Sequence, residues 1–159
     1  MGCGKSSTGR ALAVRLGARF VDLDEEIVRR DGRSIPEIFR EDGEAAFRAL
    51  ELEVLRSVLS EAAAGGMTVV ALGGGALTLP EAREIIFART RCVWLRTRLE
   101  TIRQRLGATD ASRPLFRDAA TLYAVREPVY ARAPFVVDTD GETPAAVASA
   151  ILALVFPVS

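Results

Sequence analysis

The stretch Met1-Gly-Cys-Gly-Lys-Ser-Ser-Thr8 decides the fold class of this 159-residue chain. Its centre, Gly4-Lys5-Ser6, matches the end of the phosphate-binding loop G-x-x-x-x-G-K-[ST], and a helical pattern follows at once. In such a loop backbone N–H groups surround a polyphosphate, the lysine reaches the outer phosphates, and the hydroxyl binds Mg²⁺. The positive end of the helix dipole adds to the same place. We therefore predict a nucleotide-phosphate site with these candidate residues: Gly2, Gly4, Lys5, Ser6 and Ser7.

The position of this loop in the sequence leads to a second expectation. The first glycine of the motif would lie one residue before Met1, and the strand that normally feeds the loop would also lie upstream. We expect the natural start about ten residues earlier, enough for a strand of ordinary length and the glycine. Met1 would then be an internal methionine or a boundary of the expressed chain. A parallel sheet without its central first strand would leave two neighbouring strands with unpaired backbone groups.

Composition and charge exclude several classes of protein. The 21 basic and 21 acidic residues balance, so no nucleic-acid or membrane partner is indicated, and no apolar run is long enough to span a bilayer. The distant Cys3 and Cys92 favour neither a disulfide nor a zinc site and suit a reducing cytoplasm. Because histidine is absent, any general base must be a carboxylate. Lys5, the only lysine, falls where the loop motif requires one.

Helical and strand patterns alternate along the whole chain. The apolar spacing predicts strands over 19–24, 67–72, 92–95 and 135–138. It predicts helices over 5–16, 25–30, 44–63, 81–89, 98–106, 119–131 and 143–154, with another helix starting at Ser34. The alternation indicates an α/β fold in one domain, residues 1–159, with a parallel sheet and right-handed crossovers. Residues 107–117 are expected to form an exposed, mobile loop.

Two acids, Asp22 and Asp24, stand where the first predicted strand ends. Ligands of open α/β sheets bind at the C-terminal ends of the strands. Residues two apart on a strand point to the same side, so both carboxylates would converge on one site. In a phosphoryl-transfer enzyme one acid can order Mg²⁺-bound water and the other can orient the attacking hydroxyl. A polar strand end that caps the next helix is the alternative interpretation.

Arg48 lies on the long predicted helix, four residues after Glu44 and three before Glu51. The spacing alone favours solvated salt bridges within the helix. The functional alternative is an arginine held by acids so that its planar fork can bind a carboxylate.

The run Gly73-Gly74-Gly75 directly follows a buried strand pattern. A turn rarely needs three glycines, since one residue with positive φ usually suffices. Such a run at the C-terminal end of a strand fits a backbone that must approach a ligand closely.

Three arginines in the second half of the chain are further candidates. Arg105 lies just before the predicted mobile loop, and Arg113 lies within it. Arg113 could close over a transferred phosphate or be a simple surface residue. Arg126 lies in Arg-Glu-Pro-Val-Tyr130, where Pro128 could aim the preceding turn inward.

Six motifs occur in order, and together they resemble the shikimate kinase family. They are Gly-Cys-Gly-Lys-Ser6, Phe20-Val-Asp-Leu-Asp24, Gly43-Glu-x-x-Phe-Arg48, Leu72-Gly-Gly-Gly-Ala76, Arg113-Pro-Leu115 and Arg126-x-Pro-x-Tyr130. The resemblance covers essentially the whole chain. It implies a P-loop kinase fold, α/β/α in three layers, around a five-stranded parallel sheet whose first, central strand is missing from this sequence. It also implies ATP-dependent phosphorylation of the 3-hydroxyl of shikimate on the route to chorismate and aromatic amino acids.

The resemblance implies roles for the nucleotide-side residues. Lys5 would contact the transferred phosphate, Ser6 would bind Mg²⁺, and Asp22 would act on this ion through water. Arg113 would be the arginine of a mobile lid, about 107–117, that reaches the phosphates. Two further positions match those that line the adenine site, Arg105 and Pro144.

The resemblance equally implies the substrate side. Asp24 would hold the shikimate hydroxyls and take the proton, while Arg48 and Arg126 would clamp the carboxylate. The backbone of Gly73, Gly74 and Gly75 would complete that pocket. A monomer is expected from the same likeness.

Two alternatives remain open at this point. One is another small-molecule kinase of the same fold, such as a gluconate or nucleotide kinase, although a carboxylate clamp has no purpose for a nucleotide. The other is an inactive relative that binds ligand without turnover, because the first strand is missing. GTPases are excluded, since their Asn-Lys-x-Asp motif cannot occur in a chain that has no asparagine.

Overall fold

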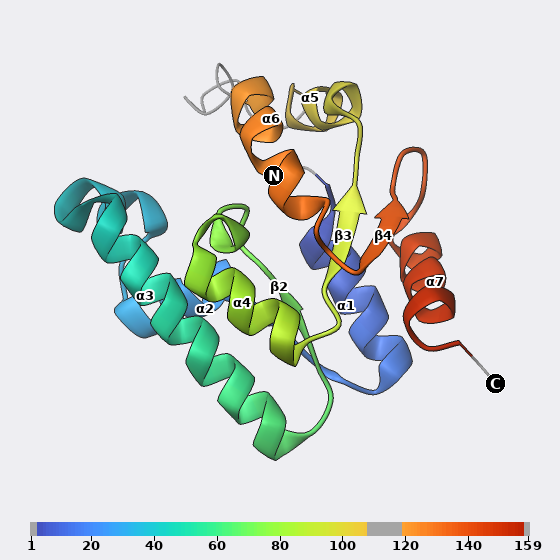
Figure 1. The fold of residues 1–159 in the computed structure, drawn as a ribbon, viewed down its shortest axis with the longest axis horizontal. Coiled ribbons are helices and arrows are strands. Elements are labelled where there is room, and N and C mark those ends of the chain that lie inside the picture. The colour runs from blue at the N-terminus through green and yellow to red at the C-terminus, as the bar shows by residue number, and fades with distance from the viewer. Residues whose placement is uncertain (1–2, 108–118, 158–159) are drawn as a thin grey trace.

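The computed structural model describes residues 3–107 and 119–157, which form an α/β fold with helices on both sides of the strands (Figure 1). Strands alternate with helices, as the sequence predicts. The strands are β1 (Arg19–Asp22), β2 (Thr68–Ala71), β3 (Val93–Arg96) and β4 (Phe135–Asp138). The helices are α1 (Lys5–Leu16), α2 (Leu23–Asp31), α3 (Ile35–Gly65), the 3-10 helix η1 (Ala76–Thr78), α4 (Pro80–Arg89), α5 (Leu99–Gly107), α6 (Ala119–Tyr130) and α7 (Pro144–Val155).

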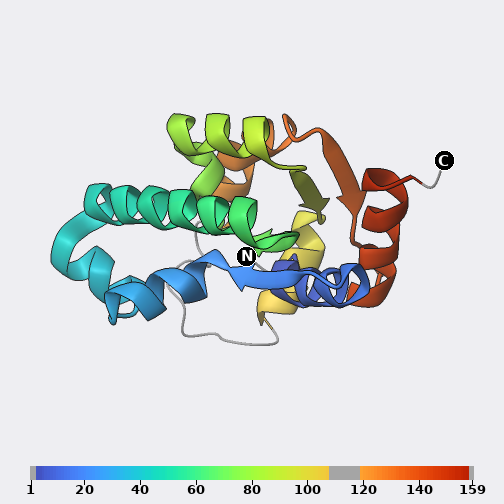
Figure 2. The same ribbon diagram turned by 90° about the horizontal axis from the view of Figure 1, so that it is seen from below.

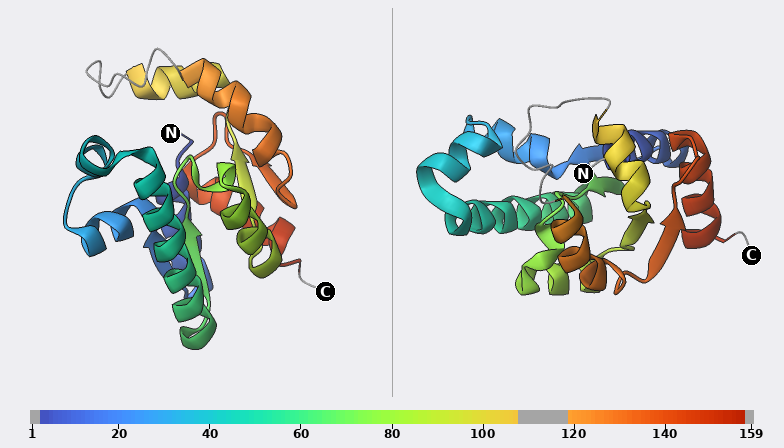
Figure 3. Two further views of the ribbon diagram at one scale, coloured as in Figure 1. Left: turned by 60° about the vertical axis from the view of Figure 1, so that its left-hand side comes forward. Right: turned by 90° about the horizontal axis from the view of Figure 1, so that it is seen from above.

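The strands form two separate parallel pairs in the part of the chain that the structure describes. β1 pairs with β2, so that Asp22 lies opposite Ala71, and β3 pairs with β4, so that Arg96 lies opposite Asp138. No ladder joins β2 to β3 in these residues, and Figures 2 and 3 show the two strands apart. The predicted parallel direction is therefore confirmed, while the sheet itself is divided between β2 and β3.

Two apolar clusters cover the two faces of the divided sheet. One joins α1 and α7 to side chains of the strands, among them Val69 and Leu95. The other joins α2, α3 and α4 to the opposite faces of the same strands, among them Val70 and Trp94. Successive strand residues point to opposite faces, so neighbours such as Val69 and Val70 enter different clusters. The result is the three-layer α/β/α arrangement that the family resemblance implies.

The first strand ends earlier than predicted. It stops at Asp22, and Asp24 lies in the first turn of α2 instead of on a strand. The reason is that the Asp22 side chain accepts hydrogen bonds from the backbone N–H groups of Asp24 (3.1 Å) and Glu25 (3.4 Å) and so caps the helix. The helix-cap interpretation of the strand end is thus confirmed for Asp22, and the interpretation of the two acids as same-side strand residues is wrong.

The two helices predicted around 34–63 are one element, α3, with a kink at Gly43. This glycine has φ 83° and ψ 174°, a left-handed conformation that favours glycine. The predicted start is confirmed, since the Glu37 carboxylate accepts hydrogen bonds from the backbone N–H (2.8 Å) and the hydroxyl (2.6 Å) of Ser34. The kink therefore changes the direction of the helix just before Arg48. Among the helices described, none is long and apolar enough to span a membrane.

Candidate active site

The phosphate-binding loop enters α1 as the motif requires. Gly4 is the N-cap of the helix and has φ 79°, which a side chain would disfavour, and its carbonyl accepts a hydrogen bond from the Thr8 N–H at 2.9 Å. Lys5, Ser6 and Ser7 form the first turn of the helix, where free N–H groups and the helix dipole favour an anion. The predicted placement of these residues is confirmed for the described part of the loop, whereas Gly2 lies outside the described residues.

Asp22 connects this loop to the next helix. One of its carboxylate oxygens caps α2, and the other accepts a hydrogen bond from the Ser6 hydroxyl at 2.5 Å. A small cavity of about 280 Å³ opens beside the pair and is lined by Lys5 and Asp24 as well. A hydroxyl and a carboxylate are oxygen ligands of the kind that Mg²⁺ binds, with water completing its octahedron. The residues present therefore fit a magnesium ion coordinated by Ser6 and, directly or through water, by Asp22.

Asp24 carries a perturbed carboxyl group beside the same cavity. Burial raises the pKa of this group, and the negative charge of Asp22 raises it further, while the cationic Lys5 and Arg48 oppose the shift. A carboxylate whose pKa is raised is a stronger base than an ordinary aspartate. The position and the raised pKa of Asp24 therefore suit a general base, a carboxylate that accepts a proton.

Arg48 points inward, contrary to the solvated salt bridges that its spacing favours. Its guanidinium lies 2.6 Å from a carboxylate oxygen of Glu51, whose side chain is only 3% exposed, and 3.5 Å from Glu44, which is 71% exposed. Burial raises the pKa of Glu51, and the hydrogen bond from Arg48 opposes that shift. Only the Glu44 pair is solvated. Glu51 therefore holds the Arg48 fork in place from the buried side.

The three glycines after β2 are required by space and not by backbone conformation. Positive φ occurs at other glycines of the described chain but at none of these three. A β-carbon on Gly73 would lie 2.6 Å from Asp24 Oδ1 and 3.0 Å from a Glu51 oxygen. A β-carbon on Gly74 would lie 2.9 Å from Arg126 Nη1, and one on Gly75 would lie 2.6 Å from Arg48 Nη1.

Each glycine of the run therefore makes room for a different charged side chain of the predicted substrate site. The sequence pattern predicts that a ligand approaches the backbone of this glycine run. The structure adds that three side chains from three helices already lie against the same backbone: Asp24, Arg48 and Arg126. The three side chains whose convergence the family resemblance implies do meet, at the C-terminal end of β2.

Tyr130 is a site residue to which sequence reasoning gave no role. Its hydroxyl donates a hydrogen bond to the Gly74 carbonyl, and its ring packs against Trp94 with 6.2 Å between the ring centroids. Burial raises the pKa of its hydroxyl, which therefore stays a donor. Tyr130 thus ties α6, which carries Arg126, to the glycine loop. Its place in the motif Arg126-x-Pro-x-Tyr130 was the available signal.

Three predicted residues remain. Arg105 lies on α5, and Pro144 is the first residue of α7. Arg113 and nearly all of the predicted lid, 108–117, lie outside the described residues. The assignment of these three residues to the nucleotide stays a prediction.

Comparison with known proteins agrees with the geometry. The family model described as shikimate kinase matches residues 1–155. The shikimate kinase of Parasynechococcus marenigrum is 46% identical, with 97% of this chain and 81% of that protein covered. That of Moorella thermoacetica is 41% identical, with 95% and 87% covered.

Solved structures of the same family superpose closely. Shikimate kinase from Acinetobacter baumannii in complex with shikimate gives a TM-score of 0.88 at 36% identity, covering 98% of this chain and 88% of that one. Shikimate kinase from Aquifex aeolicus gives 0.83 at 33% identity, covering 96% and 89%. The family resemblance carried by the six sequence motifs is confirmed, and the chain belongs to the shikimate kinase family.

Proposed function

We propose that this protein transfers the γ-phosphoryl group of ATP to the 3-hydroxyl of shikimate, on the route to chorismate and the aromatic amino acids. Membership of the shikimate kinase family supports a small-molecule kinase, and a relative of similar fold has been solved with shikimate bound. One observation carries the choice of substrate: Arg48, Arg126 and Asp24 all meet at Gly73–Gly75. Two guanidinium forks and one carboxylate suit an acceptor that has a carboxylate and hydroxyl groups.

The nucleotide occupies the P-loop side of the site in this proposal. Backbone N–H groups of Gly2, Gly4 and Ser7 and the Lys5 amine bind the phosphates. Ser6 binds Mg²⁺ directly and Asp22 holds it through water. When bound, the ion neutralises charge on the phosphate oxygens during transfer. The 2.5 Å hydrogen bond between these two side chains supports the pairing, because it places both oxygens beside one small cavity.

The acceptor occupies the glycine-loop side. Arg48 and Arg126 bind the shikimate carboxylate, for which a planar fork offers two parallel hydrogen bonds. Asp24 accepts the proton of the 3-hydroxyl. The hydroxyl oxygen forms a bond to the γ-phosphorus while the bond from this phosphorus to the β-γ bridging oxygen breaks, which releases ADP. The raised pKa of Asp24 supports its role, since proton transfer is most efficient when the pKa of the base approaches the working pH.

Three further assignments complete the proposal. Arg113, on a lid of about 107–117, reaches the transferred phosphate, and Arg105 and Pro144 line the adenine site. The motif Arg113-Pro-Leu115 supports the first assignment, and the family resemblance alone supports the other two. We further propose that the protein is a monomer of the cytoplasm, with no nucleic-acid partner, as its balanced charge suggests.

A coupled assay of ADP release tests the proposal. We expect turnover with shikimate and Mg-ATP, none with gluconate, and strongly reduced turnover with the methyl ester of shikimate, which lacks the charge that the arginines bind. A Lys5→Ala variant serves as the inactive control. Turnover with gluconate and none with shikimate would refute the choice of acceptor. ATP and shikimate binding without any turnover would instead identify an inactive relative.

A further inference from the structure

Each carbonyl of the glycine run Gly73–Gly75 accepts a hydrogen bond from the protein. The first carbonyl accepts from the Ala76 N–H at 3.2 Å, and the second accepts from the Tyr130 hydroxyl. The third, that of Gly75, accepts two hydrogen bonds from Thr78, one from its N–H at 3.0 Å and one from its hydroxyl at 2.6 Å. Among the described residues, Tyr130 and Thr78 are therefore the two side chains that hold the run by its carbonyls.

The N–H groups of the same three glycines have no hydrogen-bond partner in the part of the chain that the structure describes. Gly75 itself is buried, and a buried N–H group without a partner costs free energy comparable to a lost hydrogen bond. A ligand that accepts hydrogen bonds removes this cost. The protein thus occupies the carbonyl groups of the run and leaves its N–H groups available to an acceptor molecule.

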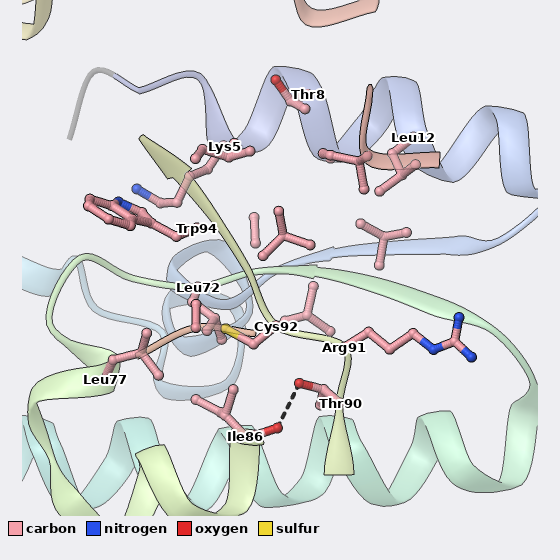
Figure 4. A pocket seen from close by; sticks show the side chains of 18 of the residues that line it. Lys5, Thr8, Leu12, Leu72, Leu77, Ile86, Thr90, Arg91, Cys92 and Trp94 are labelled. Atoms are coloured by element: carbon pink, nitrogen blue, oxygen red, sulfur yellow. Dashed lines mark hydrogen bonds between the residues drawn. The ribbon is translucent and has the colours of Figure 1, made fainter. Parts of the chain in front are cut away.

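Thr78 belongs to η1, which is anchored in the core. Ala76 is fully buried, and Leu77 packs in the same apolar cluster as Ile86 of α4. Figure 4 shows both side chains, Leu77 and Ile86, lining the apolar cavity of about 1010 Å³ between the two strand pairs. The Leu77 carbonyl in turn accepts a hydrogen bond from the Arg83 guanidinium at 3.2 Å. Thr78 therefore ties the glycine run to a part of the core that has little freedom to move.

A small displacement of Gly75 would disturb Arg48. A β-carbon on Gly75 would overlap Arg48 Nη2 and lie 2.7 Å from Cζ, so the backbone here lies directly against the guanidinium. Glu51 also holds this guanidinium at 2.6 Å, so the fork cannot follow the backbone without losing that contact. The position of Gly75 therefore sets both its own N–H group and the Arg48 fork.

We propose that Thr78 is a positioning residue for the acceptor. Its hydroxyl fixes the Gly75 carbonyl, and this keeps the Gly75 N–H group and the Arg48 fork where an acceptor carboxylate can bind to both. The role rests on the proposed function, which places the acceptor on the glycine-loop side. Because the Thr78 N–H still holds the carbonyl when the hydroxyl is removed, the loop keeps its fold and only its placement shifts. If the hydroxyl served the turn alone, its loss would change stability and leave acceptor binding as it is.

Replacement of Thr78 by valine, which has the same branched shape without the hydroxyl, tests the proposal. We expect the KM for shikimate to rise about three- to tenfold, the effect of one hydrogen bond, while kcat and the KM for ATP stay within about twofold. The preference for shikimate over its methyl ester, measured as a ratio of kcat/KM values, should fall with it, because the carboxylate contact is the one disturbed. Thr78→Ser keeps the hydroxyl and should restore the KM to within about twofold of the wild type.

Thr90→Val is the matched control. The Thr90 hydroxyl donates a hydrogen bond of 2.7 Å to the Ile86 carbonyl, drawn as a dashed line in Figure 4. The same kind of hydrogen bond is thus lost at the opposite end of α4 from Thr78. This variant should keep kcat and both KM values and show a similar change in Tm. Titration calorimetry with shikimate repeats the comparison without turnover.

Four results would overturn the role of Thr78 and leave the proposed function intact. They are a shikimate KM that Thr78→Val leaves within about twofold of the wild type, an equal rise in the KM for ATP, an equal effect of Thr90→Val, and no recovery in Thr78→Ser. The same criteria apply to Thr78→Ala, which removes the hydroxyl without placing an apolar branch against the carbonyl. A wild-type protein that neither binds nor phosphorylates shikimate would instead refute the proposed function, and the role of Thr78 with it.

Discussion

Replacement of Gly75 by alanine isolates the role of the glycine run. The residue has φ −102° and ψ −7°, which any residue adopts, so the change adds no backbone strain. The new β-carbon would overlap Arg48 Nη2, its nearest neighbour, and would lie 2.6 Å from Nη1 and 2.7 Å from Cζ. Ordinary contact begins at 3.4 Å, so the guanidinium must move by about 1 Å. It cannot move freely, because Glu51 holds it at 2.6 Å.

A displacement near 1 Å in a positioned group can reduce turnover by about a hundredfold. We expect kcat/KM for shikimate to fall roughly ten- to hundredfold, or about 1.4–2.7 kcal/mol, mainly through KM. The KM for ATP should not change, because the P-loop is untouched. Initial rates with either substrate varied measure both quantities, and thermal unfolding should show only a small change in Tm.

Gly65→Ala is the matched control. Gly65 ends α3, has no positive φ, and a β-carbon there would meet nothing within 4 Å. Its kinetics should equal those of the wild type, with equal or slightly higher stability, since alanine favours helix more than glycine. If Gly75→Ala keeps the shikimate KM within twofold of the wild type, the glycine run does not serve to make room for Arg48, and this reasoning is wrong.

Three further predictions concern the same site. Lys5→Ala should abolish turnover while shikimate binding, measured by titration calorimetry, persists. Arg126→Ala should keep turnover but raise the shikimate KM at least about tenfold, and equal losses of kcat in both variants would contradict the division of roles. Tyr130→Phe removes the hydrogen bond to the glycine loop, worth about 1 kcal/mol, and should raise the shikimate KM several-fold, an effect that Tyr123→Phe should not share. Asp24→Asn should abolish turnover and also alter the pH dependence of stability. The pKa of Asp24 is raised in the folded state, so its carboxyl group stabilises the folded protein below the ordinary pKa of 3.8. This stabilisation is lost as pH rises through the pKa of the folded state. Urea unfolding from pH 4 to 7 should therefore show the variant gaining stability relative to the wild type as pH rises, and parallel curves would contradict the shift.

The agreement between sequence and structure is best for elements with strong local signals. Gly17 ends α1 in a left-handed conformation, and Thr143 caps α7 by accepting a hydrogen bond from the Ala146 N–H at 3.2 Å, both at predicted positions. Caps and glycine stops act within a few residues, so the sequence contains the whole interaction. The error in the predicted end of β1 also comes from a local interaction, because the Asp22 side chain caps α2 and so ends the strand before Asp24.

The inward position of Arg48 could not be predicted from its spacing. A glutamate three residues away on a helix is ordinarily solvated, and only packing of α3 against α2 and the glycine loop buries Glu51. Tyr130 was missed for the same reason, because its partner is 56 residues away along the chain.

The sequence by itself determined the loop that binds phosphate, the alternation of helices and strands, and the set of residues that carry the chemistry, because these depend on residue type and near neighbours. Only the tertiary structure decided how the set works together. It brings Asp24, Arg48 and Arg126 from three helices onto three consecutive glycines, and it leaves an apolar cavity between two strand pairs. Both features depend on contacts between segments far apart in the chain, and such contacts form only when the helices pack onto the strands.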